Sequence, residues 1–225
     1  MNCVFCLKQL IPEINWTYLL SKEPICHICE ECKEKLEIIS GEVCAICGRS
    51  VESLNEKTCS DCYRWEQQKT WKGVLEKNTA LFHYNPFLKD IIAQFKYRGD
   101  YHVAAAFSLF IPKNVAKNKI AVPIPLSTER LYERGFNQAE AILHYANIPY
   151  IPCLSRTHGE KQSKKTRQQR LQSENIFSLK GKDRINTQDI LLIDDIYTTG
   201  ATLRHAAKLL KEAGAHSVSS FTIAR

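Results

Sequence analysis

Hydrophobic residues follow two alternating periods along the carboxyl-terminal two thirds of the chain. Leu88, Ile91, Ile92 and Phe95 have the i, i+3, i+4, i+7 spacing of an amphipathic helix, which Gly99 can end. Apolar runs predict strands over residues 119–126, 150–154, 189–193 and 217–224, and helical spacing recurs over 127–145 and 203–213. Strands that alternate with helices indicate an α/β fold with a doubly wound, mainly parallel sheet.

The first 65 residues have a different character. They hold nine of the ten cysteines, and 7 basic against 10 acidic side chains. The remaining 160 residues hold 24 basic against 14 acidic side chains, within a net charge of +7 for the whole chain. We therefore expect a small cysteine-rich module over 1–65, a linker over 66–77 and an α/β domain over 78–225. The basic domain suits phosphates or polyanions as partners.

Composition places the chain among ordinary globular proteins. Hydrophobic residues make up 44% of its 225 residues and charged residues 24%. No run approaches the roughly 18 uncharged apolar residues of a membrane helix, and the first ten residues lack the pattern of a secretory signal. We expect a cytoplasmic protein without membrane insertion. In a reducing compartment, clustered cysteines indicate a metal site before they indicate disulfides.

Four CxxC pairs that share no residue can be drawn in the first 65 residues. Two such pairs supply the four thiolates of a closed structural zinc site, so eight cysteines predict two structural Zn2+ sites. Redox or catalytic thiols are less favoured, because four pairs exceed what a dithiol enzyme uses. At the first site, Cys26 can replace Cys32 by pairing with Cys29, and His27 lies between them. Sequential pairing gives one site from Cys3, Cys6, Cys29 and Cys32, and the other from Cys44, Cys47, Cys59 and Cys62.

The stretch ILLIDDIYTTGATL, residues 190–203, carries the most specific pattern in the domain. A buried strand ends in Asp194 and Asp195, and a turn of small residues leads into a helix. Such a turn offers free backbone N–H groups and the positive end of a helix dipole to a phosphate, while carboxylates suit ribose hydroxyls. A solvated acidic turn is the less favoured interpretation. The predicted phosphate-binding residues are Thr198, Thr199, Gly200, Ala201 and Thr202.

This stretch resembles the signature of the type I phosphoribosyltransferase family. The resemblance implies a phosphoribosyltransferase-type fold for 78–225 and binding of phosphoribosyl pyrophosphate (PRPP), or another ribose phosphate, with Mg2+. Asp194 and Asp195 would then hold the ribose hydroxyls, and the loop would surround the 5′-phosphate. Some members carry an aspartate at the position where this chain has Thr198. Because that aspartate is absent here, one candidate base is missing. The catalytic residue therefore stays unassigned.

Three further segments are similar to the ComF family of late competence proteins, of the ComFC type, whose members begin with a double zinc ribbon. These segments are FKYRGDY at 95–101, VPIPLSTERLYERGFNQA at 122–139 and KQSKKTRQQRL at 161–171. The resemblance implies a role in natural transformation. It implies action in the cytoplasm on incoming single-stranded DNA, with a ComFA-type helicase as partner.

Basic and aromatic residues in these segments suit either phosphate-bearing partner. Arg130 and Arg134 lie one helical turn apart and can reach a pyrophosphate or a DNA phosphate. Tyr97 and Tyr101, among cations, are candidates for stacking on single-stranded bases. A solvated helix face and a solvated charged loop are the plain alternatives. Further candidates for pyrophosphate or DNA phosphate lie in a basic segment, at Lys161, Arg167 and Arg170.

Two functions remain from the sequence. The first is a competence protein that acts on DNA and has a PRPP-binding pocket. The alternative is an active magnesium-dependent phosphoribosyltransferase of nucleotide or base metabolism. In that family the loop after the first domain strand holds pyrophosphate through backbone N–H groups. Here Pro123 and Pro125 occupy this place, and proline has no backbone N–H to donate. A zinc-only adaptor leaves the phosphate loop unexplained.

Overall fold

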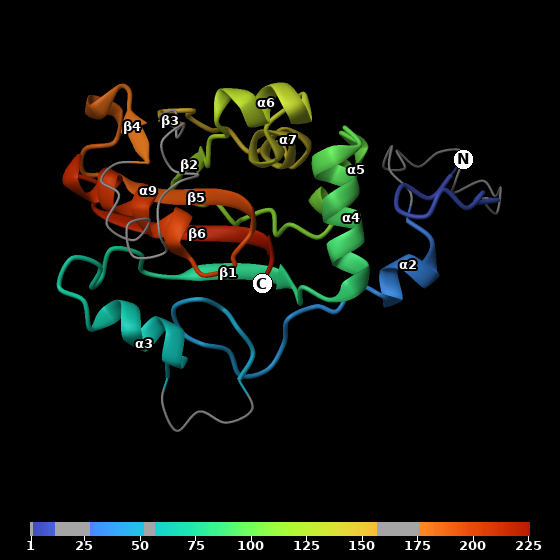
Figure 1. Cartoon of the computed structure of the whole chain (residues 1–225), viewed down its shortest axis with the longest axis horizontal. Helices are drawn as coiled ribbons and strands as arrows, with labels where there is room; N and C mark the ends of the chain where they lie inside the picture. Colours follow the sequence, from blue (N-terminus) through green and yellow to red (C-terminus); the bar gives the residue numbers. More distant parts are fainter. Residues whose placement is uncertain (1, 12–27, 52–56, 157–175) are drawn as a thin grey trace.

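A four-stranded parallel sheet forms the centre of the computed structural model, which describes residues 2–11, 28–51, 57–156 and 176–225. Its strand order is β1-β6-β5-β2, and every neighbouring pair is parallel (Figure 1). This arrangement confirms the predicted α/β class with a mainly parallel sheet. The strands are β1 (Asn78–Phe82), β2 (Ile120–Pro123), β5 (Asp189–Ile196) and β6 (Ser217–Ala224).

Helices cover both faces of this sheet. Side chains of successive strand residues point to opposite faces, so a strand such as β5 contributes apolar residues to both helix layers. Leu191 and Ile193 of β5 belong to the core that α4, α5 and α7 form, whereas Ile190 and Leu192 belong to the core beneath α9. Apolar side chains on both faces explain why β5 is a continuous apolar run. The helices are α4 (Pro86–Tyr97), α5 (His102–Ser108), α6 (Thr128–Arg134), α7 (Gln138–Tyr145) and α9 (Ala201–Glu212).

The predicted helix over 127–145 is two helices, α6 and α7. Gly135 adopts φ +78° at the end of α6, a left-handed conformation that ends a helix and that glycine adopts at low cost. Asn137 then caps α7 by accepting a hydrogen bond from the Ala139 N–H at 2.9 Å. The helical spacing of apolar residues continues across the break, so the sequence pattern did not reveal it.

Other boundaries differ by smaller amounts. β5 extends three residues beyond the predicted end, because Asp194 and Ile196 still pair with Thr222 and Ala224 of β6. In the region of the strand predicted over 150–154, only Tyr150 joins the main sheet, through one bridge to Ala121. The pattern missed β1, α5 and a small antiparallel pair of strands, β3 (Leu154–Arg156) with β4 (Phe177–Leu179).

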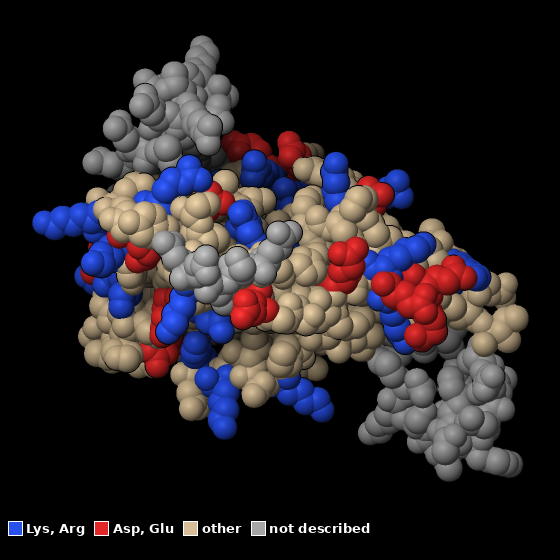
Figure 2. All heavy atoms as spheres, turned by 90° about the horizontal axis from the view of Figure 1, so that it is seen from below, with Lys and Arg blue, Asp and Glu red and all other residues tan. Residues whose placement is uncertain are grey.

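The cysteine-bearing segments contact different parts of the domain. α2 (Glu30–Glu34) and the first residues lie beside α4 and α5, whereas α3 (Ser60–Glu66) lies on the side of β1 (Figure 1). On the face shown in Figure 2, Lys and Arg side chains are interspersed with Asp and Glu, and acidic side chains gather at the end where α2 lies. This face is therefore not a continuous basic surface. No helix among the described residues is long and apolar enough to cross a membrane.

Candidate phosphate site and metal centres

Asp194 and Asp195 lie at the carboxyl end of β5, the edge of a parallel sheet where ligands of α/β proteins bind. Asp195 has the same parity as Leu191 and Ile193, so its side chain lies on the face of α4. There its Oδ2 is 2.6 Å from Nζ of Lys96, and both side chains are largely buried. Asp194 accepts a hydrogen bond from the Asp195 N–H at 2.9 Å. Burial and the neighbouring Asp195 charge raise the pKa of Asp194 to about 8.

The loop after β5 turns sharply into α9. Gly200 adopts φ +77° there, and a Cβ at this position would collide with the side chains of Tyr197 and Arg204. The side chains of Thr198 and Thr199 are exposed, and Oγ1 of Thr199 accepts a hydrogen bond from the Ala201 N–H at 3.4 Å. Among the described residues, the N–H groups of Thr198, Thr199 and Gly200 have no hydrogen-bond partner. The loop thus has free donors next to two carboxylates.

Three arginines gather near this edge of the sheet. Burial lowers the pKa of Arg156, and the positive charges of Arg130 and Arg134 lower it further, whereas the charge on Asp194 opposes this change. Arg134 donates to Oε1 of Gln138 at 3.0 Å, and its Nε is buried without a partner in the described structure. Because three guanidiniums repel one another, an added anion would be stabilised there.

The two tyrosines proposed for base stacking differ in exposure. Tyr97 is 72% exposed, and the Arg134 guanidinium lies 5.7 Å from its ring centroid. Tyr101 is half-buried, with its ring 4.9 Å from that of Phe136 and 5.3 Å from that of Tyr145. Of these two tyrosines, Tyr97 is the one that offers a largely open ring to a base.

Some predicted residues cannot be placed, and others were missed. Lys161, Arg167 and Arg170 lie outside the described residues, as do Cys26 and His27. Sequence reasoning did not assign Lys96 or Arg156 to the site. Lys96 lies in the FKYRGDY segment and Arg156 ends β3, but no short-range pattern relates either residue to Asp194 or Asp195.

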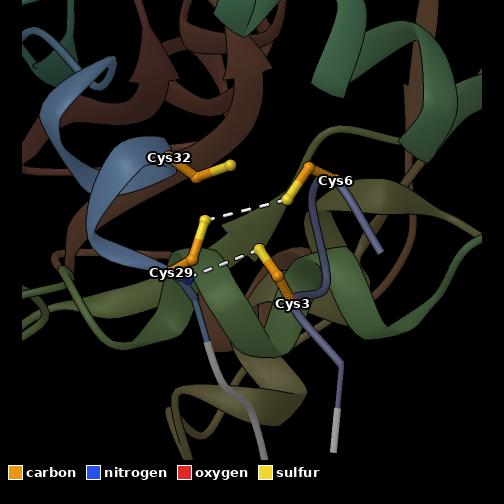
Figure 3. A group of neighbouring side chains, drawn as sticks. All are labelled: Cys3, Cys6, Cys29 and Cys32. Carbon is orange, nitrogen blue, oxygen red and sulfur yellow. Dashed lines mark hydrogen bonds between the residues drawn. The ribbon is translucent and has the colours of Figure 1, made fainter. Parts of the chain in front are cut away.

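The first cysteine cluster joins Cys3, Cys6, Cys29 and Cys32, whose sulfur atoms all lie within 4.8 Å of one another (Figure 3). Sγ of Cys6 is 3.7 Å from Sγ of Cys29, and the Cys29 N–H donates to Sγ of Cys3 at 3.4 Å. The cluster belongs to the core on the α4 and α5 face, where the Phe5 ring lies 5.8 Å from that of Phe107. Its neighbours are thus mainly apolar.

The second cluster joins Cys44, Cys47, Cys59 and Cys62, also within 4.8 Å of one another. It belongs to the opposite core, beneath α9. A hydrogen bond with Cys62, together with the Arg225 guanidinium 3.4 Å away, lowers the pKa of Cys47 to about 4. A cysteine whose thiolate is favoured in this way is a suitable metal ligand.

Both clusters fit zinc by their geometry. A tetrahedral ion with Zn–S bonds of about 2.3 Å places sulfur atoms about 3.8 Å apart. One sulfur–sulfur separation in each cluster, Cys6 to Cys29 and Cys47 to Cys59, is 3.7 Å. Each set also combines two CxxC pairs, as the sequence predicted. These eight cysteines would hold two zinc ions, which would link segments that are distant in sequence.

The carboxyl-terminal part of the chain matches the family model "Phosphoribosyl transferase domain" over residues 134–225. This match, the parallel sheet and the two four-cysteine clusters define the class. The protein is a phosphoribosyltransferase-type α/β protein with amino-terminal metal-binding modules of the zinc-ribbon kind.

Curated relatives define the particular family. The chain is 40% identical over 231 residues to Competence protein ComFC of Bacillus subtilis (strain 168), covering 99% of this chain and 94% of the relative. It is 35% identical over 229 residues to Competence protein ComFC of Streptococcus pneumoniae, covering 100% of both chains. The chain belongs to the ComFC family of competence proteins.

Solved structures are more distant. A hypoxanthine phosphoribosyltransferase from Staphylococcus aureus is 19% identical, with a TM-score of 0.32 over 60% of this chain and 62% of that one.

Proposed function

We propose that this competence protein binds a ribose 5-phosphate ester, of which PRPP with Mg2+ is the prime candidate, at the carboxyl end of β5. The observation that carries the proposal is the row of N–H groups at Thr198, Thr199 and Gly200, which have no partner among the described residues and lie in the loop after Asp194 and Asp195. Backbone N–H groups at the start of a helix are suited to a terminal phosphate.

Different residues would contact different groups of the ligand. Asp194 and Asp195 would accept hydrogen bonds from the ribose hydroxyls, and the hydroxyl groups of Thr198, Thr199 and Thr202 would add donors to the phosphate. Arg130, Arg134 and Arg156 would meet a second anionic group, because they are electrostatic neighbours and the Nε of Arg134 is buried with no partner in the part of the chain that the structure describes. Mg2+ would enter with the ligand and neutralise part of the pyrophosphate charge.

Ligand binding is tested by thermal unfolding of the purified chain with millimolar PRPP and Mg2+. We expect the ligand to raise the melting temperature of the wild type and to leave that of Asp195→Asn unchanged. Asp189→Asn is the matched control, since Asp189 is a carboxylate at the other end of β5, and this variant should keep the shift. No stabilisation of the wild type by PRPP, ribose 5-phosphate or pyrophosphate would reject the site.

We also propose that the protein acts in the cytoplasm on incoming single-stranded DNA, with a ComFA-type helicase as partner. Support comes from the family and from the exposed Tyr97 ring beside Arg134, an aromatic group paired with a cation. Sedimentation of the purified chain with the helicase of the same organism tests the partnership. A complex should sediment faster than either protein, and independent sedimentation at micromolar concentrations would contradict it.

Phosphoribosyl transfer is the second candidate function, favoured by the match of residues 134–225 to the transferase domain. In this reaction the bond between the anomeric carbon and the pyrophosphate oxygen breaks, and pyrophosphate leaves with the electron pair. The lone pair of an acceptor nitrogen forms the new bond. Release of pyrophosphate from PRPP in the presence of nucleobases, absent from Asp194→Asn, would support transfer. Binding of PRPP without release would support a pocket that only binds.

A further inference from the structure

Two arginines of the carboxyl-terminal part meet the second cysteine cluster. Arg204, in α9, is fully buried, and its guanidinium donates to Oη of Tyr197 at 2.5 Å and to Sγ of Cys62 at 3.9 Å. Arg225, after β6, donates to Sγ of Cys47 at 3.4 Å. Each guanidinium therefore contacts both a cysteine sulfur and the loop region that follows β5.

The charges of this arrangement are complementary. Among the described residues, no Asp or Glu carboxylate lies within 4 Å of Arg204 or Arg225. The fully buried Arg204 guanidinium would be strongly destabilising without a counter-charge. A zinc ion held by four thiolates carries two net negative charges, which two guanidiniums balance. The surroundings of the second cluster thus fit a zinc tetrathiolate better than four neutral thiols.

Arg225 also holds the backbone of the phosphate loop. Arg225 donates to the carbonyl of Tyr197 at 3.2 Å and to that of Thr198 at 2.7 Å. Trp65, on the helix that carries Cys62, donates through Nε1 to the carbonyl of Thr199 at 3.2 Å. Three successive loop carbonyls are thus held by residues that surround the second cluster.

Peptide geometry converts these contacts into an orientation of the donors. In a planar trans peptide the C=O of one residue and the N–H of the next point in opposite directions. The carbonyls of residues 197–199 point toward the cluster. The N–H groups of Thr198, Thr199 and Gly200, which belong to the same peptide units, therefore point away from it. These are the groups that have no partner in the described structure.

The first cysteine cluster has no comparable connection. Among the described residues, no arginine contacts its sulfur atoms, and it packs against Phe5 and the α5 side of the core. It therefore serves as an internal comparison within the same chain.

We propose that Arg204 and Arg225 are positioning residues that couple the second zinc centre to the phosphate loop, so that zinc and a phosphate ester bind with positive linkage. The coupling rests on the phosphate site proposed above. Linkage is reciprocal: a centre that raises the affinity of the loop for the ester gains zinc affinity by the same factor when the ester binds.

The coupling is tested with the Arg225→Gln chain and PRPP–Mg2+ as the probe. We expect this chain to keep two zinc ions and to bind the probe at least about 5-fold more weakly than the wild type by calorimetry. Arg64→Gln is the matched control, because Arg64 is an exposed arginine on α3 that pairs with Asp61. This control should bind like the wild type.

Equilibrium competition with a chromogenic zinc chelator tests the reverse direction. In the wild type, saturating probe should raise the apparent affinity for one of the two zinc ions by the same factor and leave the other unchanged. In Arg225→Gln that gain should disappear. Tight probe binding by the wild type together with unaltered binding by Arg225→Gln, or with no change in either zinc affinity, would overturn the coupling. The phosphate site would then still stand.

A second variant covers the case in which Arg225→Gln loses a zinc ion. Arg225→Lys keeps a positive charge beside Cys47, but a single ammonium does not reproduce the fork that reaches the sulfur and two carbonyls. Retention of two zinc ions with at least about 5-fold weaker probe binding would support the coupling. Wild-type affinity in this chain would overturn it. A wild type that binds no probe overturns the phosphate site and the coupling together.

Discussion

Nζ of Lys96, in the last turn of α4, lies 2.6 Å from Oδ2 of Asp195, at the end of β5. The two side chains are 17% and 10% exposed, so water screens this ion pair weakly. It connects the carboxyl-terminal edge of the sheet to the helix layer that covers one face, across 99 residues of sequence.

Removal of this lysine should destabilise the protein. In Lys96→Met, Asp195 loses its cationic partner while it stays buried, and we expect the free energy of unfolding to fall by about 3–5 kcal/mol. Urea unfolding followed by circular dichroism measures this change. Lys89→Met, an exposed lysine on the same helix, should change stability by less than about 0.5 kcal/mol. Equal effects of the two substitutions would show that the ion pair contributes nothing.

The raised pKa of Asp194 predicts a pH-dependent stability. Its ordinary pKa is 3.8 and the folded value is about 8, so between these values the folded state holds a proton that the unfolded state has lost. Stability of the ligand-free protein should therefore fall as pH rises from about 5 to 8. Asp194→Asn removes this loss and should melt higher than the wild type at pH 8. If the melting temperatures of the two chains changed with pH in the same way across this range, the assignment would be contradicted.

Gly200 should tolerate no side chain. Gly200→Ala combines a positive φ with a collision against Tyr197 and Arg204, whereas Gly99→Ala, at φ +67°, meets no atom within 4 Å. The backbone cost of about 1–2 kcal/mol is shared by both variants. We expect Gly200→Ala to lose at least about 2 kcal/mol more than Gly99→Ala in chemical unfolding, as overpacking costs of this size are common. Loss of PRPP binding should accompany it. Similar unfolding midpoints for the two chains would contradict the close packing of this turn.

Metal analysis should find two zinc ions per chain. Cys3→Ser and Cys44→Ser each remove one thiolate from a different cluster, so each should leave one ion bound. Chelation of both ions should lower the melting temperature markedly, because metal binding contributes to folding. Fewer than two ions in the wild type, measured by mass spectrometry of the native protein, would overturn the assignment of two sites.

Single-stranded DNA binding should depend steeply on salt. Replacement of Arg167 and Arg170 by alanine removes two phosphate contacts, which should reduce the slope of log affinity against log salt by about 1.4. Lys113→Ala with Lys117→Ala, two exposed lysines after α5, is the control with the same loss of charge. Fluorescence anisotropy with an oligonucleotide measures both slopes. An equal reduction in the two double variants would indicate a diffuse charge effect instead of a defined surface.

Local pattern was sufficient for the elements whose information is contiguous. The apolar run of β5, the small-residue turn and the helix α9 follow one another in sequence, and the CxxC pairs carry the metal geometry in their own spacing. Gly135 shows the limit of this reasoning. The apolar spacing runs through it, and only its left-handed backbone reveals that α6 ends there.

By itself, the sequence determined the parallel α/β architecture, the strand–turn–helix of the candidate phosphate site and the two sets of four cysteines. These depend on periodicity and on short spacings, which local physical chemistry restricts. Only the tertiary structure decided that Lys96 meets Asp195, that Arg156 joins Arg130 and Arg134, and that Arg225 lies between Cys47 and the loop carbonyl of Thr198. Such contacts join residues up to 178 positions apart, and their formation depends on how the packed core places distant segments.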